Sequence, residues 1–132
     1  MNLQAEATFK VDSWEEAIYE EFDDGRKFAR ATIKKSFEGD LHGEGSLEYL
    51  MAYTADGNAS FVGMEFFIGG FGKLIGSFMM QHVGTFVDGI STVSLTIVPG
   101  SATEELVGLR GEGGFDFGHG DEYPFTLDYY FD

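Results

Sequence analysis

The chain has 132 residues, of which 43% are hydrophobic and 14 are Phe, and this fits one domain, residues 1–132, with a substantial core. The formal net charge of −15 argues against nucleic-acid binding, because phosphate contacts require a basic face. The sequence has no cysteines, which excludes disulfides, thiol nucleophiles and cysteine-based metal sites.

The N-terminal segment MNLQAEATFKV lacks the basic and apolar regions of a signal peptide. No segment approaches the run of about 20 apolar residues that spans a bilayer. We therefore expect a cytoplasmic protein with no membrane partner.

Turn signals divide the chain into runs that alternate with period two and are rich in aromatic and β-branched residues. Asp-Gly pairs at 24–25, 56–57 and 88–89 are typical of tight hairpin turns. The runs predict eight strands, at residues 4–12, 27–38, 44–54, 59–68, 74–86, 91–98, 108–117 and 123–131. Eight mostly consecutive antiparallel strands predict an all-β fold that closes into a β-barrel, because closure removes unpaired edges.

Three segments are interpreted separately. The segment SWEEAIYEEF at 13–22 fits either a helical turn or extended chain. Residues 101–106 predict one short helical turn, capped by Ser101 or Thr103. Five basic residues are interpreted as a solvated strand face: Arg26, Lys27, Arg30, Lys34 and Lys35.

A two-residue turn at Asp56-Gly57 pairs Tyr53 with Ser60 and Tyr49 with Met64. One face of this hairpin is then the more apolar, and we predict that it points inward: Leu47, Tyr49, Met51, Tyr53, Val62, Met64, Phe66 and Ile68. The same register sets Glu48 opposite Glu65 on the outer face. This carboxylate pair is either an acid/base or weak cation site, or a solvated pair relieved by water or Arg110.

A second two-residue turn, at Asp88-Gly89, pairs His82 with Leu95 and Met80 with Ile97. The face that holds Phe78, Met80 and His82 is apolar, whereas the opposite face, with Gln81, is rich in Ser and Thr. We therefore predict that His82 points inward. A turn at GGFG, residues 69–72, would pair Met64 with Gly76 and keep both predicted inner faces on one side of the sheet.

The predicted interior offers an apolar lining with a few polar groups, and eight strands enclose either a filled core or one small ligand. The candidate ligand-binding residues are His82, Tyr49, Tyr53, Met51, Met64, Phe78 and Met80. His82 is either a neutral imidazole available to a ligand or to acid–base chemistry, or a core histidine bonded to a backbone carbonyl or a tyrosine.

Two further features of the sequence concern metal binding and association. The GHGDEY segment sets His119, Asp121 and Glu122 together, as a conceivable metal site or a solvated hairpin turn. No metal or cofactor is predicted. An outward apolar patch predicts a homo-oligomer, a dimer or trimer, through these residues: Leu50, Phe61, Phe67, Ile75 and Met79.

Several segments together resemble the bacterial family known as domain of unknown function 3224. They are GEGSLEYLMAY, GNASFVGMEFFIGGFG, GSFMMQHVGTFVDG and LVGLRGEGGFDFGHGDEYPFTLDYYF, and the likeness runs from about Thr8 to Phe131. That family is similar in fold to the allene oxide cyclase barrel, so the resemblance implies an eight-stranded closed barrel. It implies no reaction and transfers no catalytic residue.

The leading functional hypothesis is binding of a small apolar or amphipathic molecule inside the barrel, with His82, Tyr49 and Tyr53 as polar anchors. The first alternative is an isomerase or cyclase that folds a flexible lipid-like substrate in the barrel. The second is a structural or interaction module with a filled core.

Overall fold

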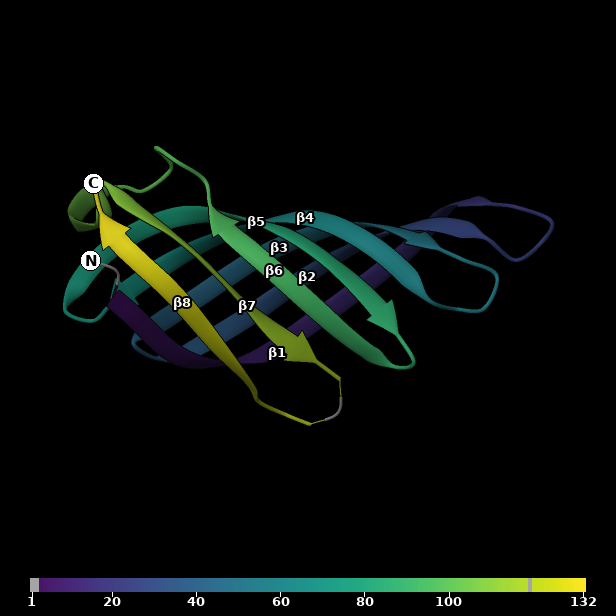
Figure 1. Cartoon of the computed structure of the whole chain (residues 1–132), viewed down its shortest axis with the longest axis horizontal. Coiled ribbons are helices and arrows are strands. Elements are labelled where there is room, and N and C mark those ends of the chain that lie inside the picture. The colour runs from purple at the N-terminus through teal and green to yellow at the C-terminus, as the bar shows by residue number, and fades with distance from the viewer. Residues whose placement is uncertain (1–2, 119) are drawn as a thin grey trace.

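The computed structural model describes residues 3–118 and 120–132 as an eight-stranded antiparallel β-barrel (Figure 1). Each strand pairs with the next in the chain, and β8 pairs with β1 to close the barrel, as the sequence predicts. The strands are β1 Leu3–Glu21, β2 Lys27–Gly39, β3 Leu41–Tyr53, β4 Ala59–Phe71, β5 Leu74–Val87, β6 Ile90–Ile97, β7 Leu109–Phe117 and β8 Tyr123–Phe131.

The ambiguous segment after residue 12 is extended and belongs to β1. Its pairing with β2 shifts register between Val11 and Ser13 and again between Ile18 and Glu20. Such irregularities bend and twist a strand locally, which a strand of 19 residues needs in order to follow a curved barrel wall. The β1–β2 hairpin projects beyond the rest of the barrel, at the end opposite both chain termini (Figure 1).

A short 3-10 turn, η1 Glu104–Leu106, connects β6 to β7. Thr103 occupies the N-cap position, but its hydroxyl bonds Ser77 at 2.7 Å, so the predicted side-chain cap is wrong. Leu106 is fully buried, and η1 packs against β5 at the end of the barrel that holds both termini. Among the residues described, no helix has the length and apolar character needed to cross a bilayer.

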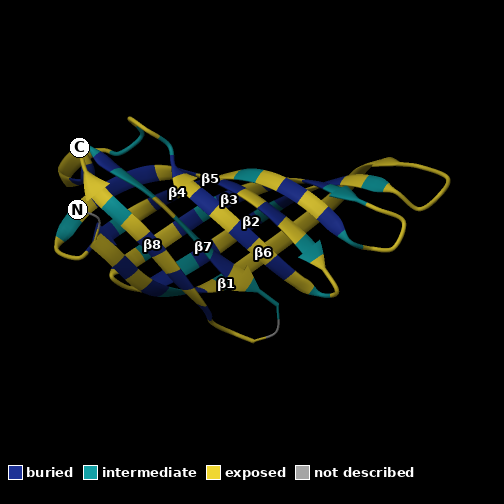
Figure 2. Cartoon of the chain, in the orientation of Figure 1, coloured by how far each residue is buried: buried dark blue, intermediate teal, exposed yellow. Residues whose placement is uncertain are grey.

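Buried and exposed residues alternate along the strands, except in the second half of β1, which holds no buried residue, so the core fills the barrel interior (Figure 2). Aromatic rings dominate this core, and edge-on or tilted contacts link them, such as Phe9 with Phe115 at 4.8 Å and Phe67 with Phe78 at 5.0 Å. The largest fully buried side chains are Phe9, Phe67, Phe78, Phe125, Ile33, Leu41, Leu47, Met80, Ile97, Leu106, Leu109 and Leu127.

The predicted turn at Asp88-Gly89 is confirmed. Both residues have positive φ, 51° and 85°, as a two-residue hairpin turn of this kind requires. His82 pairs with Leu95 and Met80 with Ile97, so His82 points into the barrel as predicted.

The predicted register of the β3–β4 hairpin is wrong by one residue. Thr54 N–H donates to the Asn58 carbonyl at 2.8 Å, which leaves three residues in the loop instead of two. Gly57 takes the left-handed conformation (φ 89°) that closes such loops, and the Asp56 carboxylate accepts bonds from the Thr54 hydroxyl and the Asn58 N–H.

A one-residue slip turns every side chain of a strand to the other face. Tyr49 therefore pairs with Gly63 instead of Met64, and the odd-numbered residues of β4 point inward. Four residues predicted inside are exposed on the outer face: Val62, Met64, Phe66 and Ile68. Two that were predicted outside, Phe61 and Phe67, are buried.

The predicted pairing across the GGFG turn is also wrong. Phe71 pairs with Leu74 across a turn at Gly72-Lys73, so Gly63 rather than Met64 lies beside β5 on the inner face, opposite His82. The predicted pairing of β4 with β5 is displaced by an odd number of residues, so it turns the faces over a second time and cancels the reversal made in the β3–β4 hairpin. The orientation of β5 is therefore correct although that of β4 is not.

Two glycines on inner faces make room for aromatic rings. An added Cβ at Gly63 would lie 2.4 Å from the Tyr49 ring, and one at Gly84 would lie 2.5 Å from the Phe61 ring. Each glycine pairs directly with the residue whose ring it accommodates. Tyr49 and Phe61 can therefore lie flat along the barrel wall, with ring centroids 4.4 Å apart.

Candidate functional site

Four polar side chains meet inside the barrel, one from each of the neighbouring strands β2 to β5. They are Lys35, Tyr49, Glu65 and His82, and each is at least 96% buried. His82 Nε2 lies 2.8 Å from Glu65 Oε1, and the Tyr49 hydroxyl lies 2.9 Å from His82 Nδ1. Lys35 Nζ donates to Glu65 Oε1 at 3.4 Å. We call this set the buried network.

The bonding pattern of the buried network fixes the histidine tautomer. The Glu65 carboxylate is only an acceptor, so His82 Nε2 carries the proton and donates to Oε1. Nδ1 of the neutral ring is then an acceptor, and the Tyr49 O–H donates to it. Tyr49, His82 and Glu65 thus form a directed chain of hydrogen bonds that ends on a carboxylate.

Lys35 is held by aromatic rings as well as by Glu65. Its Nζ lies 4.3 Å from the Phe9 ring centroid and 4.5 Å from that of Phe115. Ring faces attract a desolvated cation, which supports a charged ammonium despite its burial. With Lys35 positive, Glu65 negative and His82 neutral, the buried network carries no net charge.

The pKa values of the buried network follow from burial and charge. Burial raises the pKa of Glu65, but the Lys35 charge and the His82 hydrogen bond outweigh this and hold it below its ordinary value. Burial lowers the pKa of Lys35, partly offset by Glu65. Burial and then the Glu65 charge raise the pKa of Tyr49, so its phenol stays protonated. An ionised Glu65 and a protonated Tyr49 are the forms that the hydrogen bonds of the buried network require.

Burial lowers the pKa of His82 below its ordinary value of about 6.5, against the opposing effect of Glu65. As the pH falls through 6.5, the unfolded chain therefore takes up a proton at this position before the folded protein does. We expect the free energy of unfolding to fall by up to about 1.4 kcal/mol per pH unit from this group. Urea unfolding of the wild type and His82→Gln between pH 7.5 and about 5.5 measures the slope.

The matched control is His42→Gln, because His42 is exposed and its ring bonds the Gly72 carbonyl at 3.1 Å, away from the buried network. Loss of the slope in His82→Gln and its retention in His42→Gln is the expected pattern. Equal slopes in the wild type and His82→Gln would show that His82 is not held neutral.

Gly45 leaves space for the Glu65 carboxylate. A Cβ at this position would lie 2.2 Å from Glu65 Oε2 and 3.0 Å from the Phe37 ring. That oxygen is buried and has no hydrogen-bond partner within residues 3–118 and 120–132. Burying an acceptor without a hydrogen-bond partner destabilises the folded state, so Glu65 depends strongly on its two partners at Oε1.

An aromatic pocket lies above the buried network, at the barrel end that carries the β1–β2 hairpin. Side chains nearly fill this pocket, and the space left in it is about 10 Å³, close to one water molecule. Trp14 is 39% exposed and stacks on Phe117 at 5.9 Å. The lining residues are Val11, Trp14, Ile33, Lys35, Leu47, Tyr49, Phe61, Ser91, Val93, Phe115 and Phe117.

The structure brings some predicted site residues together and separates others. Tyr49 and His82 are in direct contact, and Met51, Phe78 and Met80 are buried in the core. Tyr53 lies at the end of β3, where its hydroxyl donates to Glu16 at 2.7 Å, away from His82. The inward prediction for Met64 is wrong, because its side chain is 56% exposed on the outer face of β4.

The predicted pairing of Glu48 with Glu65 is wrong, because Glu48 pairs with Met64 and Glu65 with Leu47. Glu48 is exposed and forms an ion pair with Arg30 at 2.9 Å. Glu65 is 1% exposed and belongs to the buried network. Of the GHGDEY candidates, His119 lies outside the described residues, and the described residues hold no cluster of metal-ligating side chains.

Lys35 is the site residue that the sequence prediction missed. The sequence pattern places Lys35 with Lys34 on a solvated strand face, but of these two lysines Lys34 is exposed and Lys35 is buried. The signal was the alternation of β2, in which Ala29, Ala31, Ile33 and Phe37 share its face. A lysine at a core position of an alternating strand predicts a buried counter-charge, and Glu65 supplies it.

The fold and the site define a small closed up-and-down β-barrel with a charged network buried beneath an aromatic pocket. The chain belongs to the family described as protein of unknown function (DUF3224), whose model matches residues 5–129. It is similar to the crystal structure of a DUF3224 family protein of unknown function from Shewanella oneidensis MR-1. The similarity has a TM-score of 0.80 and 26% identity, and covers 100% of this chain and 98% of that one. No curated protein matches the chain.

Proposed function

We propose that the protein binds a small apolar molecule with one polar end in the aromatic pocket. The observation that carries this proposal is that Lys35 and Tyr49, both nearly fully buried, line a pocket whose other lining residues are apolar except for Ser91. Binding sites for small molecules combine an apolar lining with a few placed polar groups in this way. The closed pocket has space of about 10 Å³, far below the roughly 300–1,000 Å³ of such sites, so binding requires the pocket to open.

The polar end of the ligand is expected to accept hydrogen bonds. Lys35 has three N–H groups, and within the described residues its hydrogen-bond partner is Glu65. The single O–H of Tyr49 already donates to His82 Nδ1, so the donors open to a ligand come from Lys35. A carbonyl or carboxylate oxygen that reaches Lys35 would therefore meet an N–H donor, while the rest of the molecule contacts aromatic rings.

Entry of such a ligand requires the mouth of the pocket to open. The closed pocket has space for about one water molecule, so Trp14 and Phe117 must separate to admit more. Trp14 follows the register shift at Val11/Ser13 and its ring is partly exposed, which favours this movement over one in the closely packed core.

Trp14 is the single tryptophan of the chain and reports directly on the pocket mouth. We expect 2-octanone or octanoic acid to shift its fluorescence saturably in the wild type. Ser91→Leu fills the pocket while it leaves the four residues of the buried network unchanged, and it should weaken binding at least about tenfold.

Ser94→Leu is the matched control, because Ser94 is on the same strand but exposed. Binding that survives Ser91→Leu, or a wild-type protein that shows no saturable change, would contradict the proposal. The second of these results is what the filled-core hypothesis predicts. The cyclase or isomerase hypothesis uses the same pocket, and the similarity to the allene oxide cyclase barrel stays a prediction.

A further inference from the structure

We propose that the outer face of β4 and β5 is the interface of a homodimer. This inference is independent of the proposed ligand. The face carries contiguous exposed apolar side chains from β4 and β5 with one from β3, which we call the apolar face: Leu50, Val62, Met64, Phe66, Ile68, Ile75, Met79 and Val83. It replaces the predicted patch, of which Phe61 and Phe67 are buried while Leu50, Ile75 and Met79 belong to the apolar face.

The apolar face is large enough for a stable interface. Its eight side chains, each about half exposed, present roughly 800 Å² of apolar surface, which is about what one partner contributes to a standard interface. The largest apolar patch on a typical monomer is about 300–600 Å². Tyr19 and Phe28 extend the apolar face, since they border a shallow depression together with Leu50, Val62 and Val83.

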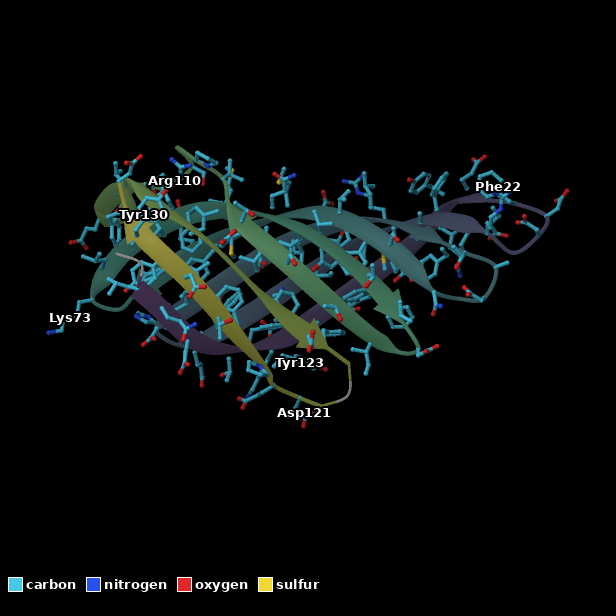
Figure 3. All side chains as sticks on the ribbon, in the orientation of Figure 1. Phe22, Lys73, Arg110, Asp121, Tyr123 and Tyr130 are labelled. Atoms are coloured by element: carbon cyan, nitrogen blue, oxygen red, sulfur yellow. The ribbon has the colours of Figure 1, made fainter. Side chains whose placement is uncertain are left out.

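Charge selects a second copy as the occupant. On the described strands β4, β5 and β6, no exposed side chain is charged, whereas the other strands all expose charges. Lys73, at the β4–β5 turn, projects from the end of the barrel rather than from this face (Figure 3). A net charge of −15 makes two copies repel each other, and this repulsion is smallest when the faces that meet carry no charge. The same charge repels anionic membranes, which disfavours a lipid surface.

The geometry of the sheet also suits self-association. Two sheet faces of the same twist pack in an aligned arrangement, so a row of side chains on β4 can lie against the same row of its copy. One contiguous patch makes a two-fold interface, whereas a cyclic trimer needs two different complementary patches. The Arg30–Glu48 ion pair borders the apolar face, which matches the polar rim of such interfaces.

The test is sedimentation equilibrium of wild type, Met64→Lys and Thr126→Lys at about 1 to 100 μM. We expect the wild type to reach twice the 14.5 kDa chain mass. Met64 lies between Val62 and Phe66 on the outer side of β4, midway along the apolar face, so Met64→Lys should weaken dimerisation at least about 100-fold. Thr126 is exposed on β8, the strand farthest from β4 in barrel order, so Thr126→Lys should dimerise as the wild type does.

A second readout locates the contact, because the chain has no native cysteine. We expect alkylation of Met64→Cys to slow at least about tenfold between dilute and concentrated protein, with Thr126→Cys unchanged. A wild type that sediments with the mass of one chain at 100 μM would overturn the proposal. A wild type that binds a different protein through this face, and never a second copy, would also overturn it. So would a Met64→Lys protein that dimerises normally or a thiol at 64 that stays fully reactive.

Discussion

Glu65→Gln is expected to destabilise the protein by about 3–5 kcal/mol at pH 7, the largest effect of any single conservative change considered. The substitution keeps the shape of the side chain but removes its charge. Lys35, which is 97% buried and donates to Glu65 Oε1, is then left without its counter-charge. Urea unfolding monitored by circular dichroism measures the loss.

Glu48→Gln is the matched control for this change. Glu48 also forms an ion pair, with Arg30, but both side chains are about half exposed. Exposed pairs contribute about 0–1 kcal/mol, so we expect Glu48→Gln to change stability by less than about 1 kcal/mol. Similar losses in the two variants would show that Glu65 is not part of a buried ion pair.

The pH dependence of Glu65→Gln gives a second readout. Burial already lowers the pKa of Lys35 in the wild type, and loss of Glu65 removes the charge that opposes this shift. Below the ordinary lysine pKa of about 10.4, the unfolded chain then binds more protons than the folded one. Its stability should therefore rise between pH 7 and 9 more steeply than that of the wild type.

The second large effect is expected for one of two adjacent phenylalanines. Phe67 is fully buried and contacts the rings of Phe37 and Phe78, whereas Phe66 is 39% exposed on the outer face. Phe67→Ala should cost about 3–5 kcal/mol through lost burial and the cavity that it leaves. Phe66→Ala, measured at concentrations low enough to keep the chain monomeric, should cost less than about 1 kcal/mol.

This pair of variants tests the orientation of β4 without reference to the buried network. Chemical unfolding of both proteins under the same conditions gives the comparison. If Phe66→Ala is the more damaging, the even-numbered residues of β4 point inward after all. Glu65 would then lie outside the barrel, and the buried network would not exist.

Much of the fold follows from local signals in the sequence. Strand alternation and regular turn residues predict the eight strands and their closure, and the Ser and Thr of β6 mark its solvent face. The orientation of β5 and β6 follows from one short turn, Asp88-Gly89, whose two positive φ angles determine the pairing. These features depend on residues close together in the chain.

The orientation of β4 depends on a subtler feature. The Asp-Gly pair at 56–57 reads as a two-residue turn, but the Asp56 side chain binds Thr54 and Asn58 and stabilises a three-residue loop. The β4 sequence itself does not decide the matter, because both of its faces are apolar: Phe61 and Phe67 on one, Val62 and Phe66 on the other. A strand that packs one face in the core and the other in an interface, as we propose for β4, has apolar residues on both faces.

The buried network could not be assembled from the sequence while β4 was misoriented. With Glu65 predicted on the outside, Lys35 has no predicted counter-charge, and His82 has predicted tyrosine neighbours but no carboxylate partner. Ion pairs of this type are set by pairing between β2, β3, β4 and β5, so their members are far apart in sequence. A single charged residue at a core position of each of two strands is the sequence signal for such a pair.

The central claim, that Lys35 and Glu65 form an ion pair inside the barrel, is tested most directly by a double-mutant cycle of Lys35→Met and Glu65→Gln. The free energies of unfolding of the wild type, both single variants and the double variant give the coupling. We predict that the double variant is more stable than either single variant, with a coupling energy of at least about 3 kcal/mol, because it removes both buried charges together. Effects of the two changes that add to within about 0.5 kcal/mol would contradict the claim.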